Sequence, residues 1–160
     1  MKKPIFCSVL LILMLDACLV QSQQLTIQIA AEKPVVLTRA DIEALPRAEV
    51  KTGEPDAPVM YAGVLLKPLL EKAGVNFGES LRGKRLASCL LVEAADGYRV
   101  VIALPEIDPA FSDKRFVLAF SRNGKPLDEK EGPYRIVIPD EKRMARWVRQ
   151  VTTLRIVDVE

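Results

Sequence analysis

The chain has 160 residues, of which 49% are hydrophobic, so it can bury the core of one domain. Its 23 lysines and arginines nearly balance its 21 aspartates and glutamates, and no basic run exceeds two residues, which argues against a nucleic-acid-binding surface. The sequence contains no histidine, which excludes histidine-based acid–base catalysis, serine–histidine triads and histidine-ligated zinc or haem.

The first 22 residues have the pattern of a signal peptide. Two lysines precede an apolar run of 12 residues, Pro4 to Leu15, which is too short to span a bilayer and typical of a secretory signal. Cleavage after Ser22 predicts a periplasmic or secreted domain, residues 23–160, with no transmembrane segment. The alternative is a lipoprotein whose lipid is carried by Cys18, although Asp16 fits poorly in the required motif.

Strand and helix signals open the predicted mature domain. LTIQIA, residues 25–30, alternates apolar and polar side chains and predicts a half-buried strand. VVL then leads into Thr38-Arg39-Ala40-Asp41, a capping pattern that predicts a short helix ending near Leu45-Pro46. AEVKT, residues 48–52, predicts another strand. GEPDAPVMYAG, residues 53–63, predicts an irregular connection because it holds two prolines and two glycines.

A second helix is predicted over VLLKPLLEKAG, residues 64–74. Pro68 is tolerated in a first helical turn, and Gly74 is suited to end the helix in the left-handed conformation. The apolar residues of this segment fall on one helical face, namely Leu65, Leu66, Leu69, Leu70 and Ala73.

The second half is predicted to consist mainly of strands. RLASCLLVEA (85–94) and YRVVIAL (98–104) flank Asp96-Gly97, which is typical of a hairpin turn. PEIDPAF predicts a turn or short helix, and three further strands are predicted in RFVLAFS before an Asn123-Gly124 turn, in YRIVIP and in TLRIVDV. Strands that dominate without regular alternation with helices indicate the α+β class, with a β-rich fold and a few short helices.

Single aromatic and basic residues give weak functional signals. Tyr61, Tyr98 and Tyr134 adjoin glycines or a Gly-Pro pair, where packing of a ring over a turn is the ordinary explanation. Arg135 lies among apolar strand residues, so it is either a surface arginine or an anion clamp. Arg146-Trp147 is either a cation–π pair or a core tryptophan beside a solvated charge.

Sulfur and carboxylate residues are equally ambiguous. Cys89 is the only cysteine after cleavage, so no intramolecular disulfide can form. Its apolar neighbours predict a buried strand residue, with a reactive thiol as the alternative. Glu106, Asp108 and Asp113 match no EF-hand spacing, so solvated loop charges are the simpler interpretation and no metal site is predicted.

Taken together, five segments resemble a known family. They are LTRADIEALPRAEVKT, YAGVLLKPLLEKAG, DGY, NGKPL, and GPYRIVIP followed by RWV. From about Leu25 to the C-terminus the chain resembles the oxidoreductase molybdopterin-binding domain, the sulfite-oxidase-type fold, in a small exported form. In catalytic relatives a Lys-Trp or similar pair follows the G-x-P-x-R strand and lies against the pterin pocket. The resemblance therefore implies a cofactor cleft lined by Tyr98, Tyr134, Arg135, Arg146 and Trp147.

One departure from the family pattern bears on function. Catalytic members carry a molybdenum-ligating cysteine after the strand equivalent to AEVKT, whereas EVKTGEPDAPVMYAG has none. Thr52 and Glu54 are poor substitutes for a thiolate, and Cys89 follows the helix, out of order for this role. We therefore expect no molybdenum redox catalysis and no assigned catalytic residue, although the resemblance leaves molybdopterin binding open.

These features lead to one hypothesis and two alternatives. The hypothesis is an exported accessory domain that binds a small anionic ligand or another envelope protein. The first alternative is an active molybdopterin-dependent oxidoreductase with a non-cysteine metal ligand. The second is a purely structural module of a larger assembly.

Overall fold

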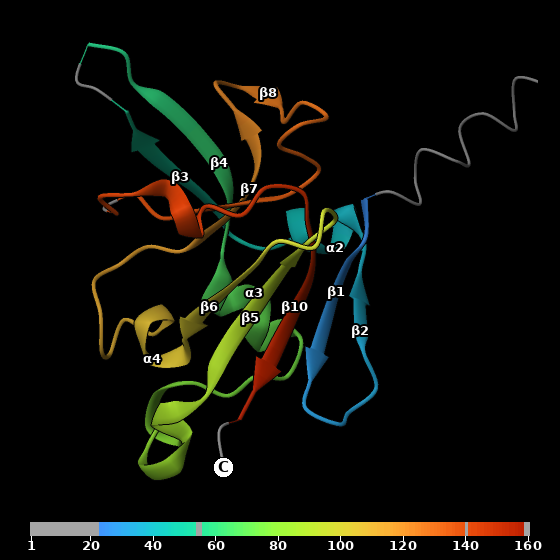
Figure 1. Ribbon diagram of the computed structural model, residues 1–160, viewed down its shortest axis with the longest axis vertical. Coiled ribbons are helices and arrows are strands. Elements are labelled where there is room, and N and C mark those ends of the chain that lie inside the picture. The colour runs from blue at the N-terminus through green and yellow to red at the C-terminus, as the bar shows by residue number, and fades with distance from the viewer. Residues whose placement is uncertain (1–22, 54–55, 140, 159–160) are drawn as a thin grey trace, which may run out of the picture.

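The computed structural model describes residues 23–53, 56–139 and 141–158, so the predicted signal peptide lies outside it. Two β-sheets form the domain, with short helices around them (Figure 1). The helices are α2 (Arg39–Glu43), α3 (Leu66–Lys72) and α4 (Leu104–Ile107), and the 3-10 helices are η3 (Gly78–Ser80), η4 (Gly83–Ala87) and η5 (Met144–Arg146). None of the described helices is long and apolar enough to cross a membrane.

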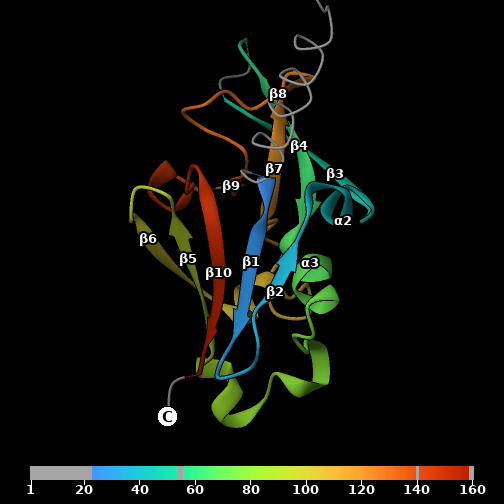
Figure 2. The ribbon, with the colours of Figure 1, turned by 90° about the vertical axis from the view of Figure 1, so that its right-hand side faces the viewer.

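One sheet joins the two ends of the described chain. Its strand order is β2-β1-β10-β5-β6. β1 and β10 are parallel, with Ile27 opposite Leu154, and the other neighbours are antiparallel, so the sheet is mixed (Figure 2). The strands are β1 (Leu25–Ile29), β2 (Val35–Leu37), β5 (Cys89–Ala94), β6 (Arg99–Ala103) and β10 (Val151–Val157).

The second sheet is antiparallel and holds two of the residues considered from the sequence, Tyr61 and Arg135. Its order is β3-β4-β7-β8, and β9 also pairs with β7. Its strands are β3 (Arg47–Thr52), β4 (Val59–Leu65), β7 (Val117–Arg122), β8 (Lys125–Pro126) and β9 (Arg135–Val137). The α+β class and the mixed, β-rich architecture predicted from the sequence are confirmed.

β4 shows that the prediction of an irregular connection over residues 53–63 was wrong from Val59 onward. This segment is a central strand paired with β3 on one side and β7 on the other, with a register shift between Ala62 and Gly63. A Cβ on Gly63 would lie 2.0 Å from the carbonyl oxygen of Leu118. This glycine therefore permits a close approach of two backbones rather than a turn.

The second helix begins later than predicted. Leu65 is its N-cap, with φ −68° and ψ 144°, so Val64 and Leu65 belong to β4. Leu66, Leu69 and Leu70 are fully buried on the predicted apolar face. Gly74, at φ +104°, follows the helix in the left-handed conformation as predicted.

Local turn and capping signals were reliable, whereas strand bounds were less so. The capping box of Thr38 and Asp41 is present, and Gly97, Asn123 and Gly124 all have positive φ. The strand predicted over residues 85–94 begins only at Cys89, since residues 85–87 belong to η4. The last two predicted strands also differ, because β9 is shorter and β10 begins earlier, at Val151.

A single hydrophobic core connects both sheets. Inward-facing residues of the mixed sheet, including Ile27, Leu90 and Leu154, belong to the same buried cluster as the α3 leucines. From β4, β7 and β9, this cluster takes Tyr61, Val64, Leu118, Phe120, Ile136 and Val137. This core fixes the two ends of the connection between β9 and β10.

Candidate functional site

The connection between β9 and β10, residues 141–150, carries the Arg146-Trp147 pair. Ile136 N–H donates to the carbonyl oxygen of Val148 at 2.8 Å, and the Tyr98 hydroxyl donates to that of Ala145 at 2.7 Å. These bonds fasten the connection to β9 and to the start of β6. The two members of the pair then contact different neighbours.

Trp147 packs into the core with only 6% of its surface exposed. Its ring meets Tyr61 edge-on at 6.2 Å, and the Arg135 guanidinium lies 5.6 Å from its centroid. Arg135 also lies 5.4 Å from the Tyr61 ring centroid. The tryptophan is thus a core residue, and its cation–π partner is Arg135 rather than Arg146.

Arg135 is only 8% exposed. It is therefore neither the surface arginine nor the open anion clamp that the sequence suggested. Its Nη1 donates to the Glu131 carboxylate and, at 3.2 Å, to the Tyr61 hydroxyl. Burial raises the pKa of that hydroxyl, and the charge of Arg135 opposes the rise. The buried cation is therefore already neutralised within the chain.

Two buried donors in this cluster lack an acceptor. Within the described part of the chain, neither Nε of Arg135 nor Nε1 of Trp147 has a hydrogen-bond partner. A buried N–H without an acceptor costs stability.

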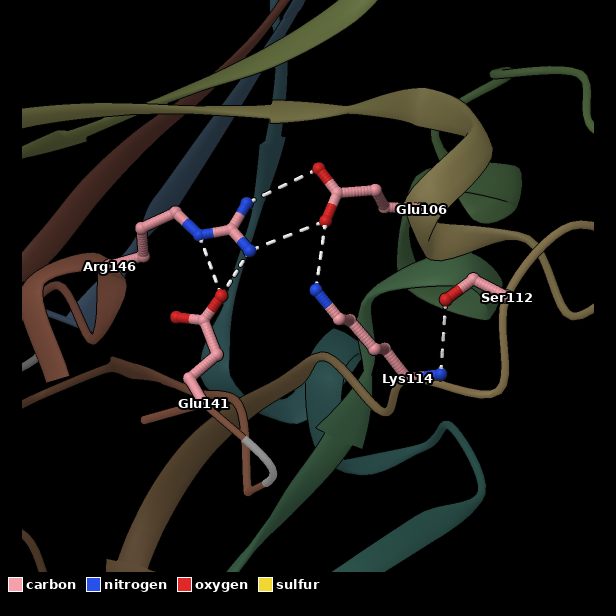
Figure 3. Close-up of polar contacts among 5 residues, drawn as sticks. All are labelled: Glu106, Ser112, Lys114, Glu141 and Arg146. Carbon is pink, nitrogen blue, oxygen red and sulfur yellow. Dashed lines mark hydrogen bonds and ion pairs between the residues drawn. The ribbon is translucent and has the colours of Figure 1, made fainter. Parts of the chain in front are cut away.

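Arg146 belongs to a separate, partly exposed network (Figure 3). Its Nη1 and Nη2 each donate to one oxygen of Glu106 on α4, at 3.3 Å. Nε donates to Glu141 at 2.8 Å, and Nη2 also donates to Glu141. Lys114 Nζ reaches Glu106 at 3.4 Å.

This network shifts the pKa of both partners. Burial alone would raise the pKa of Glu106, but hydrogen bonds and positive charge from Arg146 and then Lys114 hold it below its ordinary value. The pKa of Arg146 is raised, first by its hydrogen bond to Glu141 against the effect of burial, and then by Glu106. Both groups are charged at neutral pH.

A basic pocket of about 440 Å³ opens beside this network. Lys142 and Arg143 are exposed and form no ion pair with any other described residue. The four cations lining the pocket outnumber the carboxylates of Glu141 and neighbouring Glu106 by two charges. The lining residues are Lys114, Glu141, Lys142, Arg143 and Arg146.

The predicted cleft residues do not line one cavity. Tyr98 is 47% exposed and, with Trp147, lines a smaller pocket of about 240 Å³. Tyr134 is fully buried, its hydroxyl donates to the carbonyl oxygen of Gln23 at 2.7 Å, and burial raises its pKa to about 12. Arg135 and Trp147 are brought together in the core, and Arg146 faces the basic pocket.

The carboxylates considered for a cation are dispersed. Asp108 is buried and accepts N–H donors from Gly78 at 2.6 Å and Ala110 at 3.2 Å, which is a structural role. Within residues 23–53, 56–139 and 141–158, no cluster of three or more acidic or cysteine side chains could hold a metal ion. Cys89 is half-buried on β5 rather than fully buried, and burial followed by the charge of Asp158 raises its pKa.

Sequence analysis missed the residues that complete both clusters. Glu131 neutralises Arg135 from a loop, and Glu141 precedes Arg146 by five positions in an irregular segment. Glu131 lies four residues before Arg135 but outside any predicted helix or strand, so this spacing did not indicate a pair. Arg146 was predicted as a site residue, and the adjacent cations Lys142-Arg143 were a second visible signal of the basic pocket.

Comparison with known proteins now identifies the domain. The model of the family described as "Oxidoreductase molybdopterin binding domain" matches residues 57–160. The chain belongs to this oxidoreductase molybdopterin-binding domain family.

One solved structure extends the match. The crystal structure of the sulfane dehydrogenase SoxCD from Paracoccus pantotrophus aligns with a TM-score of 0.66 and 25% identity, over 86% of this chain and 39% of that chain. The chain thus spans well under half of that neighbour's length. No curated protein matches the chain.

The donor set of this molybdopterin-binding domain does not fit a molybdenum centre. β3 and β4, with the residues between them, contain no cysteine, and Cys89 lies on β5 in the other sheet. Arg135, one of the two cations expected to attract a cofactor phosphate, is buried and already paired with Glu131.

Proposed function

We propose that this member of the molybdopterin-binding domain family is an exported accessory domain that binds a small dianion and carries out no molybdenum redox chemistry. The observation that carries the proposal is the basic pocket of Lys114, Lys142, Arg143 and Arg146. It lies where the family resemblance places the C-terminal Arg-Trp segment, in a chain without the expected thiolate.

Ligand chemistry supports the loss of redox function. In the catalytic members that the chain resembles, the protein ligand of molybdenum is a cysteine, whose thiolate is a soft, anionic donor, and hydroxyl or carboxylate oxygen is a poor replacement for it. The segment from Glu49 to Gly63 offers no thiolate, and its carboxylates supply only oxygen donors. Hard ligands of this kind would not recreate the electronic environment of the metal.

Pocket charge supports the choice of an anion. Guanidinium groups bind tetrahedral oxyanions through paired N–H donors, and ammonium groups add point charges around them. Two excess positive charges in the pocket match the charge of sulfate or hydrogen phosphate. Arg143 and Lys142 are exposed and supply donors at the mouth.

Metal analysis tests the redox part. Protein matured and exported in a host that makes the cofactor should contain well under one molybdenum per chain and should not oxidise sulfite or reduce sulfoxides. Stoichiometric molybdenum that survives gel filtration would refute the proposal and favour the oxidoreductase with a non-cysteine ligand.

Calorimetric titration tests the anion part. At constant ionic strength, sodium sulfate or phosphate should bind and raise the melting temperature, whereas sodium chloride should not. The double substitution Lys142→Ala with Arg143→Ala should abolish the effect. Its matched control, Lys33→Ala with Lys125→Ala, removes two exposed positive charges outside the pocket and should leave binding unchanged.

Mass spectrometry of the exported protein tests the location. A mature chain beginning near Gln23 in the soluble periplasmic fraction is expected. An acylated N-terminal Cys18 would show instead that the domain is anchored through a lipid.

A further inference from the structure

Both hydrogen-bonding edges of the Arg146 guanidinium are occupied by the chain's own carboxylates (Figure 3). Glu106 takes the edge formed by Nη1 and Nη2, and Glu141 takes the edge formed by Nε and Nη2. A planar guanidinium binds an oxyanion best through such a pair of parallel N–H donors. An incoming dianion therefore finds neither edge of Arg146 free.

Glu106 also limits a second cation of the pocket. Its Oε2 accepts from Lys114 Nζ at 3.4 Å and from Arg146 Nη2 at 3.3 Å. One carboxylate thus contacts two of the four cations that line the pocket. Its removal would add both ligand donors and positive potential.

The two glutamates are not equally easy to displace. The Glu106 side chain is 33% exposed and holds Arg146 at 3.3 Å, whereas Glu141 is 12% exposed and accepts from Nε at 2.8 Å. Exposed, longer ion pairs contribute little stability. Glu106 is therefore the carboxylate that an anion would replace, with Glu141 retained to orient the guanidinium.

We propose that Glu106 is a built-in competitor of the ligand, an autoinhibitory contact that occupies Arg146 and Lys114 until a dianion displaces it. The proposal rests on the anion-binding function above and assigns that site its regulation. The displacement also breaks the tie between α4 and the β9–β10 connection, since Glu106 and Arg146 belong to these two elements. The affinity for the anion then depends partly on Glu106, although the ligand need not contact this residue.

The test compares sulfate affinity of the mature chain in three forms, by calorimetry at constant ionic strength. Glu106→Gln keeps the side-chain shape and removes the charge, so it should bind sulfate at least about fivefold more tightly than the wild type. Glu71→Gln is the matched control, because it removes the same charge from the Lys67–Glu71 ion pair on α3. Its affinity should equal that of the wild type.

Each result decides both proposals, and the first two results separate them. If wild type binds sulfate and Glu106→Gln binds it no more tightly, the competitor role is wrong and the anion-binding function stands. If only Glu106→Gln binds, the competitor role stands and anion binding by the unmodified chain does not. If neither binds, both are wrong.

A measurement on the wild type guards against a variant that fails to fold. The carboxyl-carbon NMR signal of Glu106, followed against pH, reports its pKa directly. Saturating sulfate should raise this pKa toward the ordinary value of 4.5, because Arg146 no longer donates to the carboxylate. A pKa that stays unchanged at saturation would overturn the competitor role.

Discussion

Replacement of Glu131 by glutamine should destabilise the fold severely, although the residue lies in a loop. Arg135 depends on this carboxylate for its charge balance, and the Arg135 side chain is only 9% exposed. Without Glu131 the guanidinium remains enclosed by Tyr61 and Trp147, with Nε already lacking an acceptor in the described structure. A buried cation would then have no counter-charge.

The expected loss is about 3 kcal/mol of unfolding free energy, the lower end of the range for breaking a buried ion pair. The lower end applies because the glutamine oxygen can still accept one hydrogen bond. The two aromatic faces at 5.4 and 5.6 Å also continue to stabilise the cation. For a domain of this size the loss corresponds to a fall in melting temperature of roughly 6–12 °C.

Urea denaturation followed by Trp147 fluorescence measures this loss, because the chain contains no other tryptophan. Glu129→Gln is the control, since it removes an exposed loop carboxylate two residues away. Combining Glu131→Gln with Arg135→Met should recover most of the stability, because no unpaired charge then remains. A Glu131→Gln variant within about 0.5 kcal/mol of the control would refute the reasoning and show that Arg135 is neutralised by another group.

Three further predictions follow from the geometry. Gly63→Ala should lower the unfolding free energy by about 1–3 kcal/mol or more, measured in urea, because its Cβ would meet the backbone of Leu118. The pKa of Glu106 is lower in the folded chain, so its ion pair stabilises the fold above pH 4.5 and is lost as pH falls below it. The difference in melting temperature between wild type and Glu106→Gln should therefore shrink between about pH 6 and about pH 3; a constant difference would contradict the assigned ion pair. Cys89 should react with a thiol reagent in the native protein, but slowly at neutral pH because its pKa is raised, and faster as pH passes 9.0; labelling only after denaturation would show that it is fully buried.

The parts of the fold that were predicted correctly depend mostly on residues close together in the sequence. The capping box at Thr38, the positive φ of Gly97 and the Asn123-Gly124 turn each depend on residues within one turn of the chain. Such signals need no knowledge of distant partners. They placed the helices and hairpins well enough to support the family resemblance.

Errors arose where the partner was distant in sequence. Gly63 suggested a turn, but its role is set by Leu118 on a neighbouring strand. Arg135 suggested a surface position because it interrupts an apolar strand, yet all three residues of β9 are buried. Glu131 lies only four residues away, but the burial of Arg135 also requires Tyr61 and Trp147 from two other segments, and no periodicity brings these together.

The same limit applies to the site. The sequence indicated Arg146 but not which groups it would meet, since Glu106 lies 40 residues away on α4. The resemblance placed five residues in one cleft. In the fold Arg135, Trp147 and Tyr134 are buried, whereas Tyr98 and Arg146 line two different pockets. This distribution depends on the directions of side chains in irregular segments, which the sequence pattern does not predict.

The parallel pairing of β1 with β10 imposes an order of assembly on the chain. Ile27 finds its partner Leu154 only when the last strand is available, so a chain that emerges N-terminus first has β1 beside β2 alone. The middle of the mixed sheet stays open throughout that time, and long-range closure of this kind is slow. If the domain is exported as proposed, this connectivity would delay completion of its core until the last strand has crossed the membrane.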